Sequence, residues 1–423
     1  MPYLHRSLWE VYELHLDEAA FLWGQWERAM DAAHYTLPEV VAGPEERLRA
    51  HLDGLILGGK PVAEKLLVPA LTDDDLGKVS AAAWALLHGE DADRFDLVFA
   101  RLAQAEKKEE RAALARAFEL AERPELGERL RPLLETSAPG VQALIVDLLG
   151  ARMTASGPPE WGFPLQQFLE SRHQELQAAA LRAVCRAPDP IHARLLEKPL
   201  ASPYLAVRNA AIEAGLRLGL PAARTACSKL VARNAPGARL PLAVLAMGGE
   251  PVDVATIIRK LDVESMRRDA LWALGFVGTA SAAEAVLSWV GDAALDKVAG
   301  ESFATITGVR IAGSLAKAGQ SDNRPPGEGE DEDDSDLRPV QTEDSLPSPD
   351  AGQLTAWWKD VQGRYAAEAR YVYGELWSDR GLAGAMVRGT TWRRRAWNLE
   401  LAAHGHVTAD LRSWGRHQLR GAA

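Results

Sequence analysis

The sequence predicts an all-α protein: an α-solenoid of helix–turn–helix repeats with a helical cap at each end. Two observations predict this fold. A helical pattern of apolar residues recurs about every 31 residues, and no run shows the period-two alternation of a half-buried strand. The 423 residues are 47% hydrophobic and 25% charged, which is enough for a core of ordinary size.

The repeat is defined by a polar residue near the start of one helix in each unit, with Ala two positions later in most units. These anchors are separated by 31, 31, 31, 35, 31, 31, 29 and 29 residues. They are Arg49, Ser80, Arg111, Gln142, Gln177, Arg208, Arg239, Arg268 and Lys297. A small residue after the anchor lets neighbouring helices approach closely, so we expect the anchored helices to stack.

A second amphipathic stretch lies between successive anchors, for example "DLVFARLAQA" and "VATIIRKL". Gly, Pro, Asp and Ser cluster at the joints, where Gly ends one helix and Pro prevents its continuation. In "MRRDALWALGFVG" we interpret Gly275 and Gly278 as helix termination of this kind. Each unit is therefore predicted to be helix, turn, helix.

The pattern divides the chain into four parts. Residues 1–46 are predicted to be an N-terminal helical cap and residues 47–320 the repeats, about nine units. Residues 321–352 hold 11 acidic residues and two arginines and few apolar side chains, which predicts a disordered linker. A solvated spacer and an acidic arm for a basic partner are the two interpretations of this linker.

Residues 353–423 are predicted to be a C-terminal cap rich in tryptophan, with six of the 13 tryptophans of the chain. A unit that closes the solenoid is one interpretation. A docking surface is the other, since Trp and Arg are enriched where partners bind. On that second interpretation Trp392 and Trp397 are candidate partner-binding residues.

Several stretches carry a family resemblance. "YLAVRNAAIEAGLRLG" and "VESMRRDALWALGFVG" resemble the second helix of short HEAT-like repeats. In such repeats an Asp often meets an Arg six residues later, and Asp262 and Arg268 match this spacing. "DEAAFLW", "EERLRAHLDGL", "RYVYG" and "GTTWRRRAWNLEL" resemble an uncharacterised bacterial HEAT-repeat family whose genes commonly accompany type VI secretion clusters. The resemblance implies a cytoplasmic accessory role near secreted spike or effector proteins.

A polar track follows the repeat register. Five residues after four successive anchors stand Arg116, Asp147, Arg182 and Glu213, with alternating charge. If the anchored helices line the concave face, these side chains form a stripe along it. They either pair with one another between repeats or bind an extended segment of a partner, and for the second case they are candidate partner-binding residues.

The sequence contains no motif of a known catalytic or cofactor site. It has no Walker loop, no GxSxG elbow and no HExxH. "HGH" at His404 and His406 has no third metal ligand nearby in the sequence. We therefore predict no catalytic, cofactor-binding or metal-binding residues, and a protein that is not an enzyme.

Charge and composition bear on partners and location. Met1–Gln320 has a net charge of −7, which argues against binding of nucleic acid phosphates. No run of about 18 uncharged apolar residues occurs, so neither a signal peptide nor a membrane span is expected. Cys185 and Cys227 lack ligand spacing and are interpreted as reduced core residues of a cytoplasmic protein.

Two classes of function remain. The first is a non-enzymatic scaffold or adaptor for a protein partner of a type VI secretion system, such as an effector or spike protein. An immunity-type protein that blocks a toxin belongs to the same class physically. The alternative is a HEAT-like repeat enzyme, resembling a DNA glycosylase or a chromophore lyase.

Overall fold

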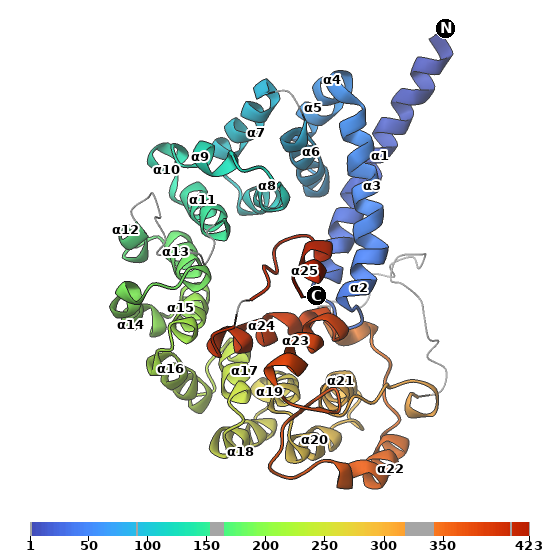
Figure 1. The fold of residues 1–423 in the computed structure, drawn as a ribbon, viewed down its shortest axis with the longest axis vertical. Helices are drawn as coiled ribbons and strands as arrows, with labels where there is room; N and C mark the ends of the chain where they lie inside the picture. Colours follow the sequence, from blue (N-terminus) through green and yellow to red (C-terminus); the bar gives the residue numbers. More distant parts are fainter. Residues whose placement is uncertain (1, 90–91, 153–164, 318–341, 407, 423) are drawn as a thin grey trace.

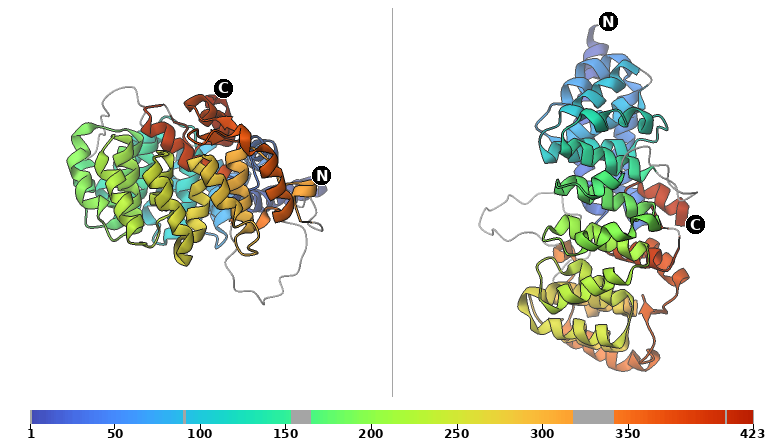
Figure 2. Two further views of the ribbon diagram at one scale, coloured as in Figure 1. Left: turned by 90° about the horizontal axis from the view of Figure 1, so that it is seen from below. Right: turned by 90° about the vertical axis from the view of Figure 1, so that its left-hand side faces the viewer.

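The computed structural model describes residues 2–89, 92–152, 165–317, 342–406 and 408–422. It confirms the predicted fold class: helices follow one another along an arc, with an inner and an outer row (Figure 1). The repeat helices stand side by side when the arc is seen from its edge (Figure 2). Within the described ranges, the two strands are β1 (Tyr371–Val372) and β2 (Glu375–Leu376), which pair in an antiparallel ladder.

The inner row is formed by the anchored helices, all nine of which are present. They are α3 (Glu46–Leu57), α6 (Leu76–His88), α8 (Lys108–Leu120), α11 (Pro139–Ala151), α13 (Gln174–Arg186), α15 (Leu205–Arg217), α17 (Arg239–Met247), α19 (Glu264–Val277) and α21 (Asp296–Thr307). Each anchor lies within the first five residues of its helix. The Ala two residues later is buried in each of the six units that have it, which agrees with close helix packing.

The outer row is less regular than the inner row, and several of its helices are short or of the 3-10 or π type. They are α4 (Gly59–Val62), η2 (Ala63–Leu67), α5 (Val68–Ala70), α7 (Ala92–Gln104), α9 (Leu126–Leu130), α10 (Leu133–Thr136), α12 (Leu165–Leu169), η3 (Pro190–Leu196), α14 (Glu197–Leu200), α16 (Pro221–Ala232), α18 (Pro251–Arg259), η4 (Lys260–Asp262), α20 (Ala280–Leu287) and η5 (Gly313–Leu315). Pro132 separates α9 from α10, because it ends the helical hydrogen bonding before it.

Several anchor side chains hydrogen-bond backbone carbonyls of the outer helices or of a loop that precedes an anchored helix. Gln142 Nε2 donates to Leu134 O at 2.7 Å, and Gln177 Nε2 donates to Leu169 O at 2.8 Å. Arg208 Nη2 donates to Pro236 O at 3.0 Å. These bonds satisfy carbonyls that the ends of helices leave free, which gives a physical reason for a polar residue at this position.

The Asp–Arg ladder suggested by the family resemblance does not form at Asp262 and Arg268. Arg268 instead forms an ion pair with Glu343, and its Nη2 donates to Ala294 O at 2.8 Å. Glu343 lies in η6 (Thr342–Ser345), within the predicted linker, and is buried. The prediction of a disordered linker is therefore wrong for residues 342–352, and residues 321–341 lie outside the described part.

The N-terminal segment consists of one long helix and one helix with a wide turn. α1 (Pro2–Ala29) packs on α3 and α6, and Trp23 and Trp26 on it are buried. α2 (Leu37–Val40) continues through the π-helical turn η1 (Val41–Glu45) into α3. The π turn places Glu45 inside the protein, where it is 1% exposed.

The C-terminal segment begins at the end of the arc and then enters its interior. α22 (Ala351–Val361) and η7 (Gln362–Arg364) come first, and α22 packs on α20 and η5. α23 (Asp379–Arg388), η8 (Thr391–Arg393), α24 (Arg394–Ala403) and α25 (Gly415–Ala422) follow and lie inside the arc (Figure 1). α24 packs on α15 and α17, and α25 packs on α2. α22 and the β1–β2 hairpin, whose β1 packs on α21, therefore have the position expected of a terminal cap.

The interior segment joins the two ends of the solenoid. Thr391 Oγ1 donates to Ala29 O at 2.7 Å and accepts from Ala32 N at 2.9 Å. Glu45 accepts from the first amides of α25, Gly415 N at 2.6 Å and Arg416 N at 2.9 Å. A carboxylate at a helix N-terminus satisfies free N–H groups and interacts favourably with the helix dipole. The arc is consequently closed by its own C-terminus.

A buried ion pair lies next to this closure. Arg393 is fully buried, and its Nε donates to Glu301 Oε1 of α21 at 2.7 Å while Nη1 donates to Trp272 O at 2.9 Å. A Cβ added at Gly275 would lie 2.6 Å from Arg393 Nη1. The interpretation of Gly275 as a helix terminator is wrong, because it lies inside α19 and makes room for this guanidinium. Gly278 does end α19, with φ +74°.

Cys227 is a core residue, as the sequence indicated, and Cys185 is partly buried against the core. Both are free, Cys227 is buried, and burial raises the pKa of both thiols to about 12. None of the helices described is long and apolar enough to cross a membrane.

Candidate functional site

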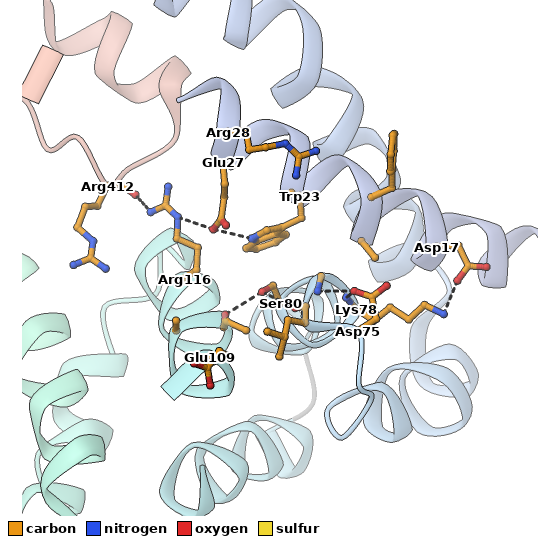
Figure 3. A pocket seen from close by; sticks show the side chains of 17 residues that line it. Asp17, Trp23, Glu27, Arg28, Asp75, Lys78, Ser80, Glu109, Arg116 and Arg412 are labelled. Carbon is orange, nitrogen blue, oxygen red and sulfur yellow. Dashed lines mark hydrogen bonds and ion pairs between the residues drawn. The ribbon is translucent and has the colours of Figure 1, made fainter. Parts of the chain in front are cut away.

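A groove of about 920 Å³ opens between α1, the start of α6 and the start of α8. Figure 3 shows α1 running along one side, α6 seen almost end-on beneath it, and Arg412 of the C-terminal segment closing one end. The walls carry four acidic and four basic side chains. They are Asp17, Glu27, Asp75, Glu109, Arg28, Lys78, Arg116 and Arg412.

The sequence "TDDDLGK" builds the α6 side of this groove. Asp75 caps α6, its carboxylate accepting from Gly77 N at 2.8 Å, as is typical of an acid just before a helix. A Cβ at Gly77 would lie 2.5 Å from Ala20 O, so glycine here lets α6 start directly against α1. Lys78 Nζ then reaches Asp17 of α1 at 2.8 Å (Figure 3).

Apolar side chains remain uncovered within these charged walls. Phe21 of α1 is 53% exposed and Leu76 at the start of α6 is 39% exposed. Trp23 of α1 also lines the groove but is only 2% exposed, and its Nε1 donates to Glu27 Oε1 at 3.2 Å. Apolar surface bounded by polar residues is typical of a site that binds another molecule.

Arg116, the first residue of the predicted polar track, lies at the end of the groove nearest the C-terminal segment. Its guanidinium contacts Glu27 at 3.4 Å and Glu119 at 3.1 Å, and it stacks on Trp26 with 4.7 Å to the ring centroid. It also donates to Arg412 O (Figure 3). Arg116 therefore connects the groove wall to the chain's own C-terminal segment.

The other three track residues also lie on inner helices, and each has a partner. Arg182 of α13 binds the Asp147 carboxylate of α11 through two hydrogen bonds, with Nε 2.9 Å from Oδ1. Glu213 of α15 accepts from Arg395 Nη2 of α24 at 2.6 Å. Asp147 and Arg182 therefore pair between neighbouring repeats, whereas Arg116 and Glu213 contact the chain's own C-terminal segment. Binding of a partner segment along the track stays a prediction.

Asp147 provides a test of the pairing through pH. Burial acts to raise the pKa of Asp147, but its hydrogen bonds with Arg182 and the charges of Arg182, Arg186 and Arg412 outweigh this and hold it below its ordinary value. The unfolded chain therefore takes up the proton first as pH falls. The stability contributed by this carboxylate is present above about pH 4, the unfolded pKa, and is lost as pH falls through the folded pKa.

We expect Asp147→Asn to lower the free energy of unfolding by about 2–3 kcal/mol at pH 7, because charged hydrogen bonds to Arg182 are lost. The difference from the original chain should shrink below about pH 4. Urea denaturation at several pH values measures it. Asp96→Asn is the control, since Asp96 is 62% exposed in its pair with Arg129. If the free energy of unfolding of Asp147→Asn differed from that of the original chain by the same amount at all pH values, a lowered pKa of Asp147 would be contradicted.

Trp392 and Trp397 do not form a docking surface. They are 5% and 1% exposed and pack on α19, Trp392 against Trp272 and Trp397 against Phe276. The expectation of a partner contact at these two residues is corrected: their apolar surface is already used to hold the C-terminal segment on the repeats.

The two histidines of "HGH" share a partner that the sequence did not reveal. His404 Nδ1 and His406 Nε2 each lie 2.9 Å from an oxygen of Asp379, at the start of α23. The 25-residue separation between Asp379 and His404 gave no local signal. Over the part of the chain that the structure describes, no group of three or more His, Cys, Asp or Glu side chains is arranged to hold a metal ion.

Comparisons with known proteins concern the fold alone. No protein-family model and no curated protein matches the chain. Among solved structures, YibA of Escherichia coli is 12% identical, with 66% of this chain and 94% of that chain covered and a TM-score of 0.30. Human deoxyhypusine hydroxylase in complex with glycerol is 18% identical, with 70% and 95% covered and a TM-score of 0.22. At these TM-scores neither likeness carries an argument about function.

The prediction that the protein is not an enzyme is withdrawn, and one of these similar structures, human deoxyhypusine hydroxylase, is that of an enzyme. The prediction rested on the absence of short sequence motifs. The fold brings together side chains that are far apart in the sequence, as Arg393 and Glu301 show, so missing local motifs cannot exclude catalysis. No activity of this chain follows from the name of that protein.

Proposed function

We propose that this chain binds a segment of another protein in the groove between α1, α6 and α8. The observation that supports this most is the exposed apolar surface of Phe21 and Leu76 inside a charged groove. Elsewhere the inner helices α15 and α17 are covered by α24. The groove lies where α1 meets the inner helices α6 and α8, and concave faces of solenoids serve as binding surfaces.

The resemblance of the sequence to a family found with type VI secretion clusters suggests the class of partner. We propose an accessory role as a scaffold or adaptor, with a spike or effector protein as the bound partner. The groove suits a polypeptide because it combines apolar anchor positions with charged walls, a combination found where a buried contact is surrounded by a polar rim.

We expect Phe21→Asp to weaken binding of such a partner about tenfold or more, because a charge replaces an apolar contact at the centre of the interface. Biolayer interferometry with purified spike and effector proteins of the same bacterium measures it. Phe21 is half exposed, so the fold should be retained, as circular dichroism would show.

The matched control for this test is Val252→Asp. Val252 is 71% exposed and lies on the outer helix α18, far along the arc from the groove (Figure 1). We expect the Val252→Asp variant to bind the partner with the same affinity as the original chain. Absence of binding to any spike or effector protein, or equal losses in the two variants, would contradict the proposal.

A further inference from the structure

The apolar surface of the groove continues along α1. Val11, Leu14 and Phe21 are 44%, 56% and 53% exposed. At 3.6 residues per turn they fall within about 80° of one another around the helix, and so on one face. Leu76 adds to this face from α6. From Val11 to Phe21 the face extends about 15 Å, or three helical turns.

Carboxylates predominate around this face. Glu10, Glu13 and Asp17 are exposed on α1, and Asp73, Asp74 and Asp75 are exposed just before α6. A smaller hollow of about 380 Å³ lies beside the groove and shares Asp17 and Lys78 with it. The hydrogen bond with Asp17, and the charges of Asp17, Asp73 and Asp75, raise the pKa of Lys78.

A second copy of this chain does not suit the surface, because it would bring the same six carboxylates against these ones. Placing like charges together at an interface is costly. A partner that is complementary has apolar side chains on one face and Lys or Arg beside them. Since the uncovered face follows a helix and borders a groove between two helices, a third helix can pack there as in helix-in-groove recognition.

We propose that the α1–α6 surface, defined by Val11, Leu14, Phe21, Leu76 and the six carboxylates around them, binds a basic amphipathic helix. The inference rests on the proposed function in that this helix belongs to the protein partner. The apolar face of the helix contacts Leu14 and Phe21, and its basic side chains contact the carboxylates before α6. Charge contacts at such a rim govern the association rate and its salt dependence.

The experiment uses the full chain and a pair of labelled helical peptides of about 18 residues, five turns. Both have Leu at the spacing of one helix face; one has Lys and the other Glu at the remaining positions. In fluorescence anisotropy we expect the Lys peptide to bind about tenfold or more tightly than the Glu peptide. Raising the salt concentration from about 50 to 500 mM should markedly weaken binding of the Lys peptide.

Two variants locate the binding. Leu14→Ser with Phe21→Ser, and Asp73→Asn with Asp74→Asn, should each weaken the Lys peptide about tenfold. The control Glu170→Gln with Glu197→Gln removes the same charge from exposed positions at the outer helices α12 and α14, across the arc (Figure 1). It should leave the affinity for the Lys peptide unchanged. Equal effects of the two charge variants would overturn the inference, since attraction to the net negative chain would then suffice.

Competition separates this inference from the proposed function. If a spike or effector protein binds the groove and the Lys peptide displaces it, both stand. If the protein binds and the Lys peptide does not displace it, the inference fails and the proposed function stands. If the Lys peptide binds at this surface and no secretion protein does, the proposed function fails in its partner class and the basic-helix surface stands.

Discussion

Glu301→Ala is expected to lower the free energy of unfolding by about 3–5 kcal/mol, because it leaves the fully buried Arg393 guanidinium without its counter-charge. Besides Arg393, Glu301 Oε1 accepts from Trp392 Nε1 at 3.1 Å and from Thr305 Oγ1 at 3.1 Å. Several buried donors therefore lose their acceptor at once. Denaturant unfolding followed by tryptophan fluorescence measures the change.

Two further variants sharpen this test. Glu375→Ala breaks the pair with Arg388, whose side chains are 62% and 59% exposed, and should change stability by less than about 1 kcal/mol. The double variant Glu301→Leu with Arg393→Met should recover much of the loss, since apolar pairs often replace a buried ion pair without cost. A loss for Glu301→Ala as small as for Glu375→Ala would contradict the buried-pair argument.

Trp414→Ala is expected to have a loss of similar size, about 3–5 kcal/mol, as for other buried tryptophans. Trp414 is 1% exposed, and its ring lies 5.0 Å from that of Trp26 and 5.9 Å from that of Trp84. Its Nε1 donates to Leu120 O at 3.3 Å. It thus contacts α1, α6 and α8 together, so its removal should also loosen their contact with the C-terminal segment.

Hydrogen exchange distinguishes this local loosening from a uniform loss of stability. In Trp414→Ala, amides of α25 and of the C-terminal part of α1 should exchange faster than those of α13. Trp289→Ala is the control, because Trp289 is only partly buried, beyond α20, where Arg267 stacks on it at 4.5 Å. Unchanged protection of α25 in Trp414→Ala would contradict its role in holding the segment.

The sequence predicted what depends on contacts between neighbouring units. The spacing of the anchors located all nine inner helices, because each unit buries its apolar face on the next and the same pattern must return. The polar track from Arg116 to Glu213 was placed on the inner row for the same reason. These features recur from unit to unit, so they can be detected as a repeated pattern in a single sequence.

The sequence did not predict the closure of the arc, because its contacts occur once and join distant residues. Thr391 and Ala29 lie 362 positions apart, and neither has a distinctive neighbourhood. The tryptophans of the C-terminal segment were noticed, but a Trp that packs inside the protein and one that binds a partner have the same local pattern. Gly275 was misinterpreted likewise, since the Arg393 it accommodates lies 118 residues later.

The link between Glu45 and α25 also sets a time order during synthesis. Glu45 cannot form its hydrogen bonds until the amides of α25, 370 residues further along the chain, have been synthesised. At about 5–20 residues per second a ribosome needs about 20–75 s to reach them. Over this interval Trp26, Trp84 and the surrounding apolar side chains have no Trp414 to cover them. The nascent chain therefore exposes this apolar surface early in synthesis and buries it only when the C-terminal segment has been made. We expect chaperones to bind its first helices during this interval.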